Sequence, residues 1–191
     1  MTRQIIEIVP AAKNIFKATL IAWNYDRGLW RRACGPWPVV IGRNGLAGLH
    51  EKREGDGKTP SGVYPLETAF GQEKALRTGL TYRQVTGDDV WVDDMASVDY
   101  NRWVKKPTQA ASYENMRRTD GVYELGAVIE YNTQPVVPGL GSAIFIHIWR
   151  DRGRKPTAGC VALDRRRLRH LLAWLRADMH PTIILGKPLK D

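Results

Sequence analysis

Short apolar segments recur along the whole chain, and each is bounded by Gly, Pro, Asn, Asp or charged residues. In most of them apolar and polar positions alternate, which is the period of a β-strand with one buried face. We therefore expect strands within residues 3–9, 16–23, 37–42, 61–70, 90–95, 121–132, 142–149 and 181–186. The pattern predicts a mainly β protein, with sheets arranged as a sandwich or barrel.

One segment near the C-terminus has the period of a helix instead. Asp164 can cap its N-terminus, and arginines occupy the face opposite the leucines. Four leucines repeat at helical spacing: Leu168, Leu171, Leu172 and Leu175. A second, weaker helical stretch is expected at residues 110–119. The predicted architecture thus has one convincing helix packed on the sheets.

The strand expected at residues 142–149 carries a histidine. Alternation places its isoleucines on one face and Phe145, His147 and Trp149 on the other. An arginine-rich loop follows and leads through Thr-Ala-Gly to Cys160. A thiol becomes a strong nucleophile when an imidazole takes its proton and nearby arginines favour the thiolate. This spacing allows a Cys-His pair, although a core cysteine and a structural histidine would fit the same pattern.

Gly159, directly before that cysteine, fits the same chemistry. A residue without a side chain lets a substrate approach the backbone closely. The amides around Gly159 and Cys160 are then placed to face a developing oxyanion. The other cysteine, Cys34, has no such neighbours, and we interpret it as structural, with both thiols free.

Length and composition limit the number of domains and the kinds of ligand that we expect for this chain. A chain of 191 residues is expected to form a single domain, residues 1–191. Its 29 basic and 20 acidic residues give a net charge of +9, which favours anionic ligands. No basic strand interleaved with aromatic residues is present, so we expect no nucleic-acid partner. No CxxC pair or HExxH motif is present either, so we expect no metal and no cofactor.

The hydropathy of the chain also bears on its location. No run approaches the roughly 18 apolar residues of a membrane span. Charged residues and a proline interrupt the first twenty positions, which is not typical of a secretory signal. We expect a cytoplasmic protein, or a periplasmic one if an export signal has been removed from the sequence.

Four motifs in order resemble the L,D-transpeptidase catalytic domain family. They are GRNG at 42–45, KREGDGKTPSGVYPL at 52–66, WVDDM with DYNRW at 91–103, and VVPGLGSAIFIH followed by PTAGCVALD at 136–164. The third motif and VVPGLGSAIFIH resemble a branch of the family in which the turn reads Ala-Gly-Cys. The resemblance covers about residues 40–185. It implies a β-sandwich-like fold with one helix after the catalytic cysteine, Cys160 as nucleophile and His147 as general base.

Two positions depart from the family pattern. Ala158 stands where most members have a histidine, and Ala162 stands where an arginine or asparagine is usual. The resemblance leaves open how this chain orients His147 and binds the substrate carboxylate. We expect Thr157 and the arginines of the loop to take over these roles: Arg150, Arg152 and Arg154.

The family resemblance also implies a substrate, the stem tetrapeptide of peptidoglycan. The cysteine would attack the carbonyl between a diamino acid and the terminal D-alanine and form a thioester. Water as acceptor would make an L,D-carboxypeptidase of cell-wall recycling, which we favour, and an amine would make a cross-linking transpeptidase. Acids and polar groups that suit the ammonium of the diamino acid are Asp93, Asp94, Tyr100 and Asn101.

Two alternatives stay open at this point. The acids of residues 91–101 would also fit a hairpin turn in which they cap backbone amides. The chain as a whole would also fit a basic, catalytically silent binding module for cell-wall fragments or nucleic acid, in which Ala158 and Ala162 mark a decayed site.

Overall fold

The computed structural model describes residues 1–186 of the 191-residue chain, and it is mainly β, as the hydropathy pattern predicts. The short η1 (Asp151–Gly153) and η2 (Ala177–Met179) are 3-10 turns, and α1 spans Arg165–Trp174. The strands are β1 (Gln4–Pro10), β2 (Lys17–Asp26), β3 (Leu29–Val40), β4 (Gly62–Pro65), β5 (Thr68–Gly71), β6 (Thr81–Gln84), β7 (Asp89–Val92), β8 (Trp103–Lys105), β9 (Tyr113–Asn115), β10 (Leu125–Val128), β11 (Phe145–Ile148), β12 (Val161–Leu163) and β13 (Thr182–Leu185).

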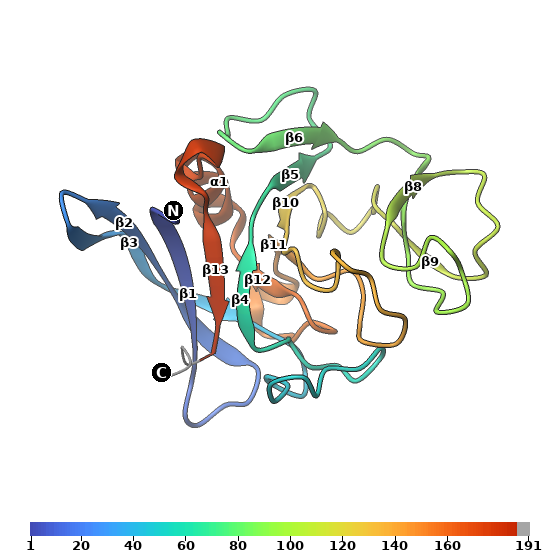
Figure 1. The fold of residues 1–191 in the computed structure, drawn as a ribbon, viewed down its shortest axis with the longest axis horizontal. Coiled ribbons are helices and arrows are strands. Elements are labelled where there is room, and N and C mark those ends of the chain that lie inside the picture. The colour runs from blue at the N-terminus through green and yellow to red at the C-terminus, as the bar shows by residue number, and fades with distance from the viewer. Residues whose placement is uncertain (187–191) are drawn as a thin grey trace.

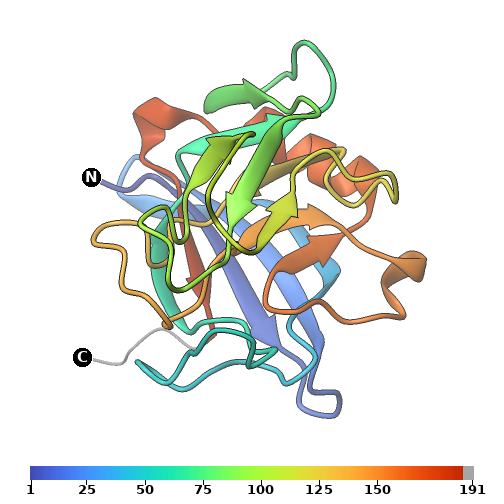
Figure 2. The same ribbon diagram turned by 90° about the vertical axis from the view of Figure 1, so that its right-hand side faces the viewer.

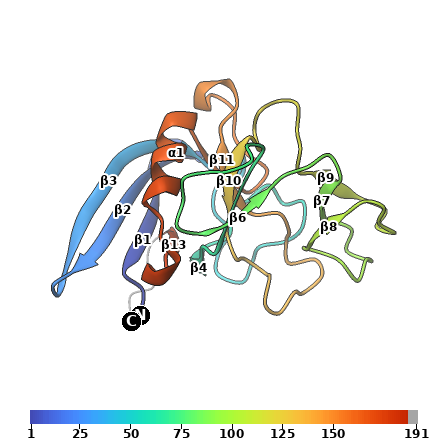
Figure 3. The same cartoon turned by 90° about the horizontal axis from the view of Figure 1, so that it is seen from above.

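The strands form one large and one small sheet (Figure 1). The large sheet has the order β4-β13-β1-β2-β3-β12-β11-β10-β5-β6, and the small one has the order β8-β7-β9. A single residue pair, Ala162 with Val40, joins β12 to β3. The large sheet therefore has two halves, and Figure 3 shows β1, β2 and β3 as one wall and β10 and β11 on the other side of α1.

The main core fills the space between these walls and the helix. Alternate residues of β1 and β2, such as Ile6 and Leu20, point into it, and α1 packs on β10 and β11. Asp164 caps this helix by accepting a hydrogen bond of 3.0 Å from the Arg167 amide. The predicted helix, its cap and its buried leucine face are confirmed.

The other face of β11 carries a second apolar cluster, which packs toward the small sheet. Phe145 is its centre, with ring contacts to Phe70, Trp91 and Tyr123. Figure 2 looks onto the small sheet, which covers this side of the molecule. Cys160 belongs to this cluster and not to the main core.

Parallel pairing of β11 with β12 sets the positions of the histidine and the cysteine. His147 lies opposite Ala162, and Ile146 lies opposite Val161. Cys160 directly precedes β12, so it lies two residues from the partner of His147 and on the same face. Sheet hydrogen bonding thus brings two residues together that an arginine-rich loop separates in sequence.

The structure corrects several sequence-based expectations. Residues 110–119 contain no helix, because the segment 113–115 is β9 and pairs with β7. Trp149 leaves the face of His147 because β11 ends at Ile148, and its ring packs on the main core instead. β3 is longer than expected, and β6, β8 and β9 were not predicted because long-range pairing defines these short segments.

Candidate active site

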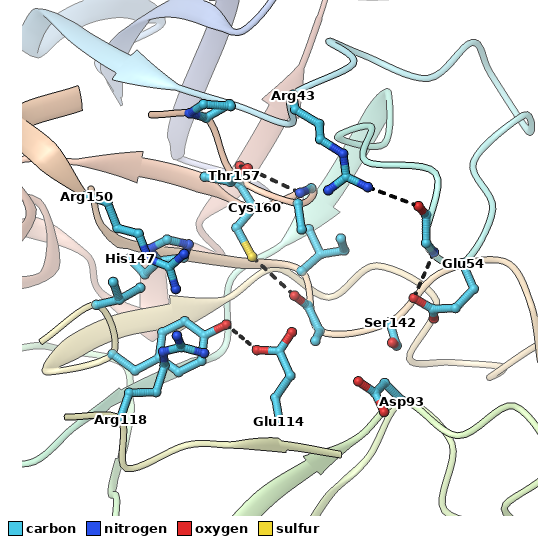
Figure 4. A pocket seen from close by; sticks show the side chains of 18 of the residues that line it. Arg43, Glu54, Asp93, Glu114, Arg118, Ser142, His147, Arg150, Thr157 and Cys160 are labelled. Atoms are coloured by element: carbon cyan, nitrogen blue, oxygen red, sulfur yellow. Dashed lines mark hydrogen bonds between the residues drawn. The ribbon is translucent and has the colours of Figure 1, made fainter. Parts of the chain in front are cut away.

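A pocket of about 290 Å³ opens between β11, β12 and the small sheet. Figure 4 shows side chains that converge on it from the strands and from the loops around them. Six of the residues that the sequence proposes for the site line this pocket: Asp93, His147, Arg150, Thr157, Gly159 and Cys160. Distant segments of the chain therefore meet at one concave surface, which is the usual form of a ligand site.

Cys160 forms the wall of the pocket and is 7% exposed. Its thiol donates a hydrogen bond of 3.2 Å to the Ala143 carbonyl, and its sulfur accepts one of 3.3 Å from the Phe145 amide. Burial raises the pKa of the thiol to about 12, and the charge of Glu114 adds to this effect. The cysteine is therefore a protonated thiol at neutral pH in the free protein.

His147 lies on β11 and is 6% exposed. Its Nδ1 is 2.8 Å from the Ile148 carbonyl, and because a carbonyl only accepts, Nδ1 carries the proton and Nε2 is free. Burial lowers the pKa of His147 to about 4, with the Ile148 hydrogen bond acting in the opposite direction. The Tyr123 ring packs edge-on against the imidazole with centroids 5.3 Å apart. The result is a neutral, oriented imidazole with one free acceptor nitrogen.

The turn before Cys160 is held together by Thr157. Its hydroxyl donates a hydrogen bond of 2.6 Å to the Cys160 carbonyl and accepts one of 3.2 Å from the Gly159 amide. A Cβ on Gly159 would lie 3.0 Å from the Lys58 carbonyl oxygen, which is a tight contact, so packing favours glycine at this position. Thr157 thus orders the cysteine turn, and the Gly159 amide is already paired.

The arginine-rich loop contributes one side chain to the pocket. Arg150 lines it and lies 3.0 Å from Asp120. Arg152 is exposed, and Arg154 is exposed and paired with Asp151 at 2.5 Å. Neither Arg152 nor Arg154 lines the pocket, because the η1 turn carries both away from it.

The two aspartates expected to bind an ammonium group of the substrate also differ in position: one lines the pocket and the other does not. Asp93 lines the pocket, where its carboxylate accepts a hydrogen bond of 2.5 Å from the Ser112 hydroxyl. Asp94 caps the amides of Ala96 and Ala111 at 3.0 and 2.8 Å, as in the alternative interpretation of this segment. It does not line the pocket.

Tyr100 and Asn101 are buried behind the pocket and do not line it. The Tyr100 hydroxyl donates to the Glu54 carboxylate and accepts from the Gly141 amide. Asn101 accepts hydrogen bonds from the Trp91 indole (2.8 Å) and the Ala143 amide (3.0 Å), and it donates to two carbonyls. Asn101 therefore holds Ala143 in place, and the carbonyl of Ala143 accepts the hydrogen bond of the Cys160 thiol.

We expect the replacement of Asn101 with alanine to lower the free energy of unfolding by about 3 kcal/mol. The change leaves several buried polar groups without partners, each of which costs about 1 to 3 kcal/mol. Urea denaturation measures the effect. The matched control is Asn115→Ala at an exposed position, for which we expect a change within about 0.5 kcal/mol. Equal effects of both changes would contradict the structural role of Asn101.

Several pocket residues were not identified from the sequence. Lys52 and Glu54 lie in the quoted motif at 52–66, which was a usable signal. Arg43 and Ser142 also lie in quoted motifs, at 42–45 and 136–147. Other members lie outside the quoted motifs, and the packing of the small sheet and the loops brings them in. They include Glu114, Arg118, Tyr123 and Lys155.

The two departures from the family pattern lie in different environments. Ala158 is exposed at the rim of the pocket. Ala162 is fully buried within the sheet, opposite both His147 and Val40, and does not line the pocket. A bulkier residue at the rim is therefore the change that would fill space next to Cys160.

Two further properties concern the described residues as a whole. Within residues 1–186, no group of three or more His, Cys, Asp or Glu side chains is arranged to hold a metal ion. The helices in that range are too short and too polar to cross a membrane.

Comparison with known proteins identifies the family. The model of the YkuD family, the L,D-transpeptidase catalytic domain, matches residues 6–184. Curled sheets with one helix agree with this fold. No curated protein and no solved structure gave a significant match. Because the match covers nearly the whole chain, the protein belongs to the L,D-transpeptidase catalytic domain family, the cysteine acyltransferases that act on peptidoglycan.

Proposed function

We propose that Cys160 is the nucleophile and that Nε2 of His147 is its general base. The observation that carries this proposal is that both side chains line one pocket, with Nδ1 of His147 occupied by the Ile148 carbonyl. That contact directs the proton-accepting nitrogen away from the backbone. The pair is neutral at rest, so the proton must move as the sulfur attacks.

The acylation step then runs as follows. Nε2 takes the thiol proton while Sγ of Cys160 bonds to the carbonyl carbon of the substrate. The Gly159 amide is occupied by Thr157, so the oxyanion faces the Cys160 amide. The imidazolium returns its proton to the leaving nitrogen as the carbon–nitrogen bond breaks. The products are a thioester and a free amine.

We propose that the scissile bond precedes the terminal D-alanine of a stem tetrapeptide and that water resolves the thioester. Nε2 then takes a proton from water, the oxygen bonds to the carbonyl carbon, and the sulfur leaves and regains its proton. A pocket of about 290 Å³ lies at the lower end of the usual range for ligand sites, which favours a small acceptor. The small, exposed side chain of Ala158 at the rim leaves water free access. We place this L,D-carboxypeptidase in the cytoplasm, acting on soluble wall fragments.

Product analysis tests this proposal. Purified protein incubated with free stem tetrapeptide should release D-alanine and tripeptide, with mass spectrometry as the measurement. Adding an amine acceptor, a second stem peptide, should leave these as the dominant products. Cross-linked dimers as the main product would contradict water as acceptor, and cell fractionation tests the location independently.

Cross-linking is the second candidate function, and one observation favours it. Three carboxylates line the pocket, from Glu54, Asp93 and Glu114, and a positively charged amine acceptor would be attracted to them. Appearance of dimers only at high acceptor concentration would indicate that both reactions share the site.

Arg150→Ala is expected to weaken apparent substrate affinity about 10-fold to 100-fold. Its guanidinium is the one from the loop that lines the pocket, and a charge-assisted hydrogen bond contributes about 1.5 to 3 kcal/mol. Steady-state kinetics on the tetrapeptide measures the change in KM. Arg152→Ala and Arg154→Ala are matched controls and should leave KM within twofold, because neither side chain lines the pocket. A larger effect of either control than of Arg150→Ala would contradict this assignment.

A further inference from the structure

Glu114 is a half-buried carboxylate that reaches from β9 into the pocket (Figure 4). Its Oε2 accepts a hydrogen bond of 2.5 Å from the Tyr123 hydroxyl. Among the described residues, no Lys, Arg or His lies within ion-pair distance of it, whereas the buried Asp89 pairs with both Arg83 and Lys105. Glu114 is thus kept in a desolvated position without a cation of its own.

None of the cationic groups around Glu114 forms an ion pair with it among the described residues. Arg118 lines the same pocket, but Asp120 binds it at 2.7 Å and offsets part of its charge. Asp93 and Glu54 line the same side of the pocket and add negative charge. Burial raises the pKa of Glu114, and the charges of Asp93 and Glu54 add to this effect, whereas the Tyr123 hydrogen bond and the charge of Arg118 act in the opposite direction. The pocket also contains Arg43, Lys52, Arg150 and Lys155, but none of them forms an ion pair with Glu114 among the described residues.

Glu114 is also coupled to the catalytic pair. Tyr123, which it binds, packs edge-on against His147 and Phe145, with centroids 5.3 and 5.5 Å away. The Phe145 amide in turn donates to the Cys160 sulfur. After burial, the charge of Glu114 is the largest contribution that raises the pKa of Cys160. A negative charge at Glu114 therefore opposes the loss of the thiol proton.

We propose that Glu114 is a specificity residue that binds a positively charged group of the acyl donor, and that this binding allows Cys160 to ionise. An ammonium on the donor supplies the cation that the protein does not provide. Once bound, it cancels the field of Glu114 at the sulfur, and His147 then takes the thiol proton. The free protein keeps an unreactive thiol, and a donor without a cation fails to activate it. This inference rests on Cys160 as the proposed nucleophile, but it does not require a particular acceptor.

The test measures how fast Cys160 reacts with two small thiol reagents, neutral methyl methanethiosulfonate and its trimethylammonium-ethyl analogue. In each case the thiolate bonds to the sulfenyl sulfur, a mixed disulfide forms and methanesulfinate leaves. The protein carries Cys34→Ala, so intact mass reports Cys160 alone. Rates are compared between this background and the same protein with Glu114→Gln, whose amide oxygen still accepts from Tyr123.

Glu114→Gln should react about tenfold faster with the neutral reagent, equivalent to a thiol pKa about one unit lower. The rate advantage of the cationic reagent should fall by a similar factor. Glu114→Asp keeps the charge and should restore most of the wild-type ratio. Glu67→Gln, an exposed glutamate outside the pocket, is the matched control and should change neither rate. A mere loss of packing would not give a faster, charge-dependent reaction.

Unchanged or slower labelling of Glu114→Gln by the neutral reagent, with an unchanged ratio, would overturn the inference. Labelling does not require turnover, so its outcome is separate from the proposed function. If D-alanine is never released but the labelling pattern appears, only the proposed function fails. If D-alanine is released normally but Glu114→Gln labels like wild type, only the role of Glu114 fails.

Discussion

Replacing Cys160 with alanine is expected to abolish release of D-alanine, lowering kcat by several orders of magnitude. The thioester cannot form without the sulfur, and no other cysteine lines the pocket among the described residues. Stability should fall by only about 1 kcal/mol, because the change removes two weak sulfur hydrogen bonds and little volume. The measurements are steady-state kinetics and thermal unfolding.

The matched control is Cys34→Ala. Cys34 lies on β3, packs against the main core and is outside the pocket. Burial raises the pKa of its thiol to about 11, so it is not a competing nucleophile. We expect wild-type kinetics for this variant. A folded Cys160→Ala protein that still releases D-alanine would exclude Cys160 as the nucleophile.

Replacing His147 with alanine should lower kcat about 100-fold to 10,000-fold, the usual contribution of a general base. With the pKa of His147 lowered to about 4, the base is already neutral at pH 5. Its protonation should therefore cause no loss of kcat/KM in the wild-type protein between pH 7 and 5. A profile that falls with an apparent pKa near 6.5 in this range would contradict the lowered value.

The lowered pKa of His147 also makes the free energy of unfolding depend on pH, and it predicts a lower stability at acidic pH. Folding lowers the pKa of His147 from its usual 6.5 to about 4, so the unfolded chain binds a proton first as the pH falls. The contribution to stability is complete above pH 6.5 and is lost as the pH falls toward 4. In His147→Ala this part of the pH dependence should disappear, which urea titrations at pH 7 and pH 4.5 would measure.

The sequence predicts the elements whose signal is local. The leucine period and Asp164 define α1, and alternation around His147 defines β11. The segment 110–119 was misassigned because its three-residue strand gains its backbone partners only from β7, which is distant in the sequence. Local propensity carries no information about such a pairing.

The site residues also divide into those with a local sequence signal, which were predicted, and those placed by long-range packing, which were not. Cys160 and His147 lie in short motifs, and the pocket brings them together. Glu114 and Tyr123 reach the pocket through packing of the small sheet and a hydrogen bond between neighbouring segments. Arg152 and Arg154 share the composition of Arg150, but the η1 turn gives the three different directions. Composition alone cannot identify which arginine faces the ligand.

The parallel register of β11 and β12 has a consequence for the integrity of the site. Backbone hydrogen bonds of the sheet hold the segment of His147 against the segment that follows Cys160. Both ends of the connecting loop are held separately, because the Trp149 amide donates to Leu163 and the Thr157 amide donates to Ile41. A single peptide bond cut at the exposed Arg154 would therefore leave both Cys160 and His147 in place. The connecting loop is the natural place to open the chain, and a circularly permuted protein with new ends there should retain its chemistry.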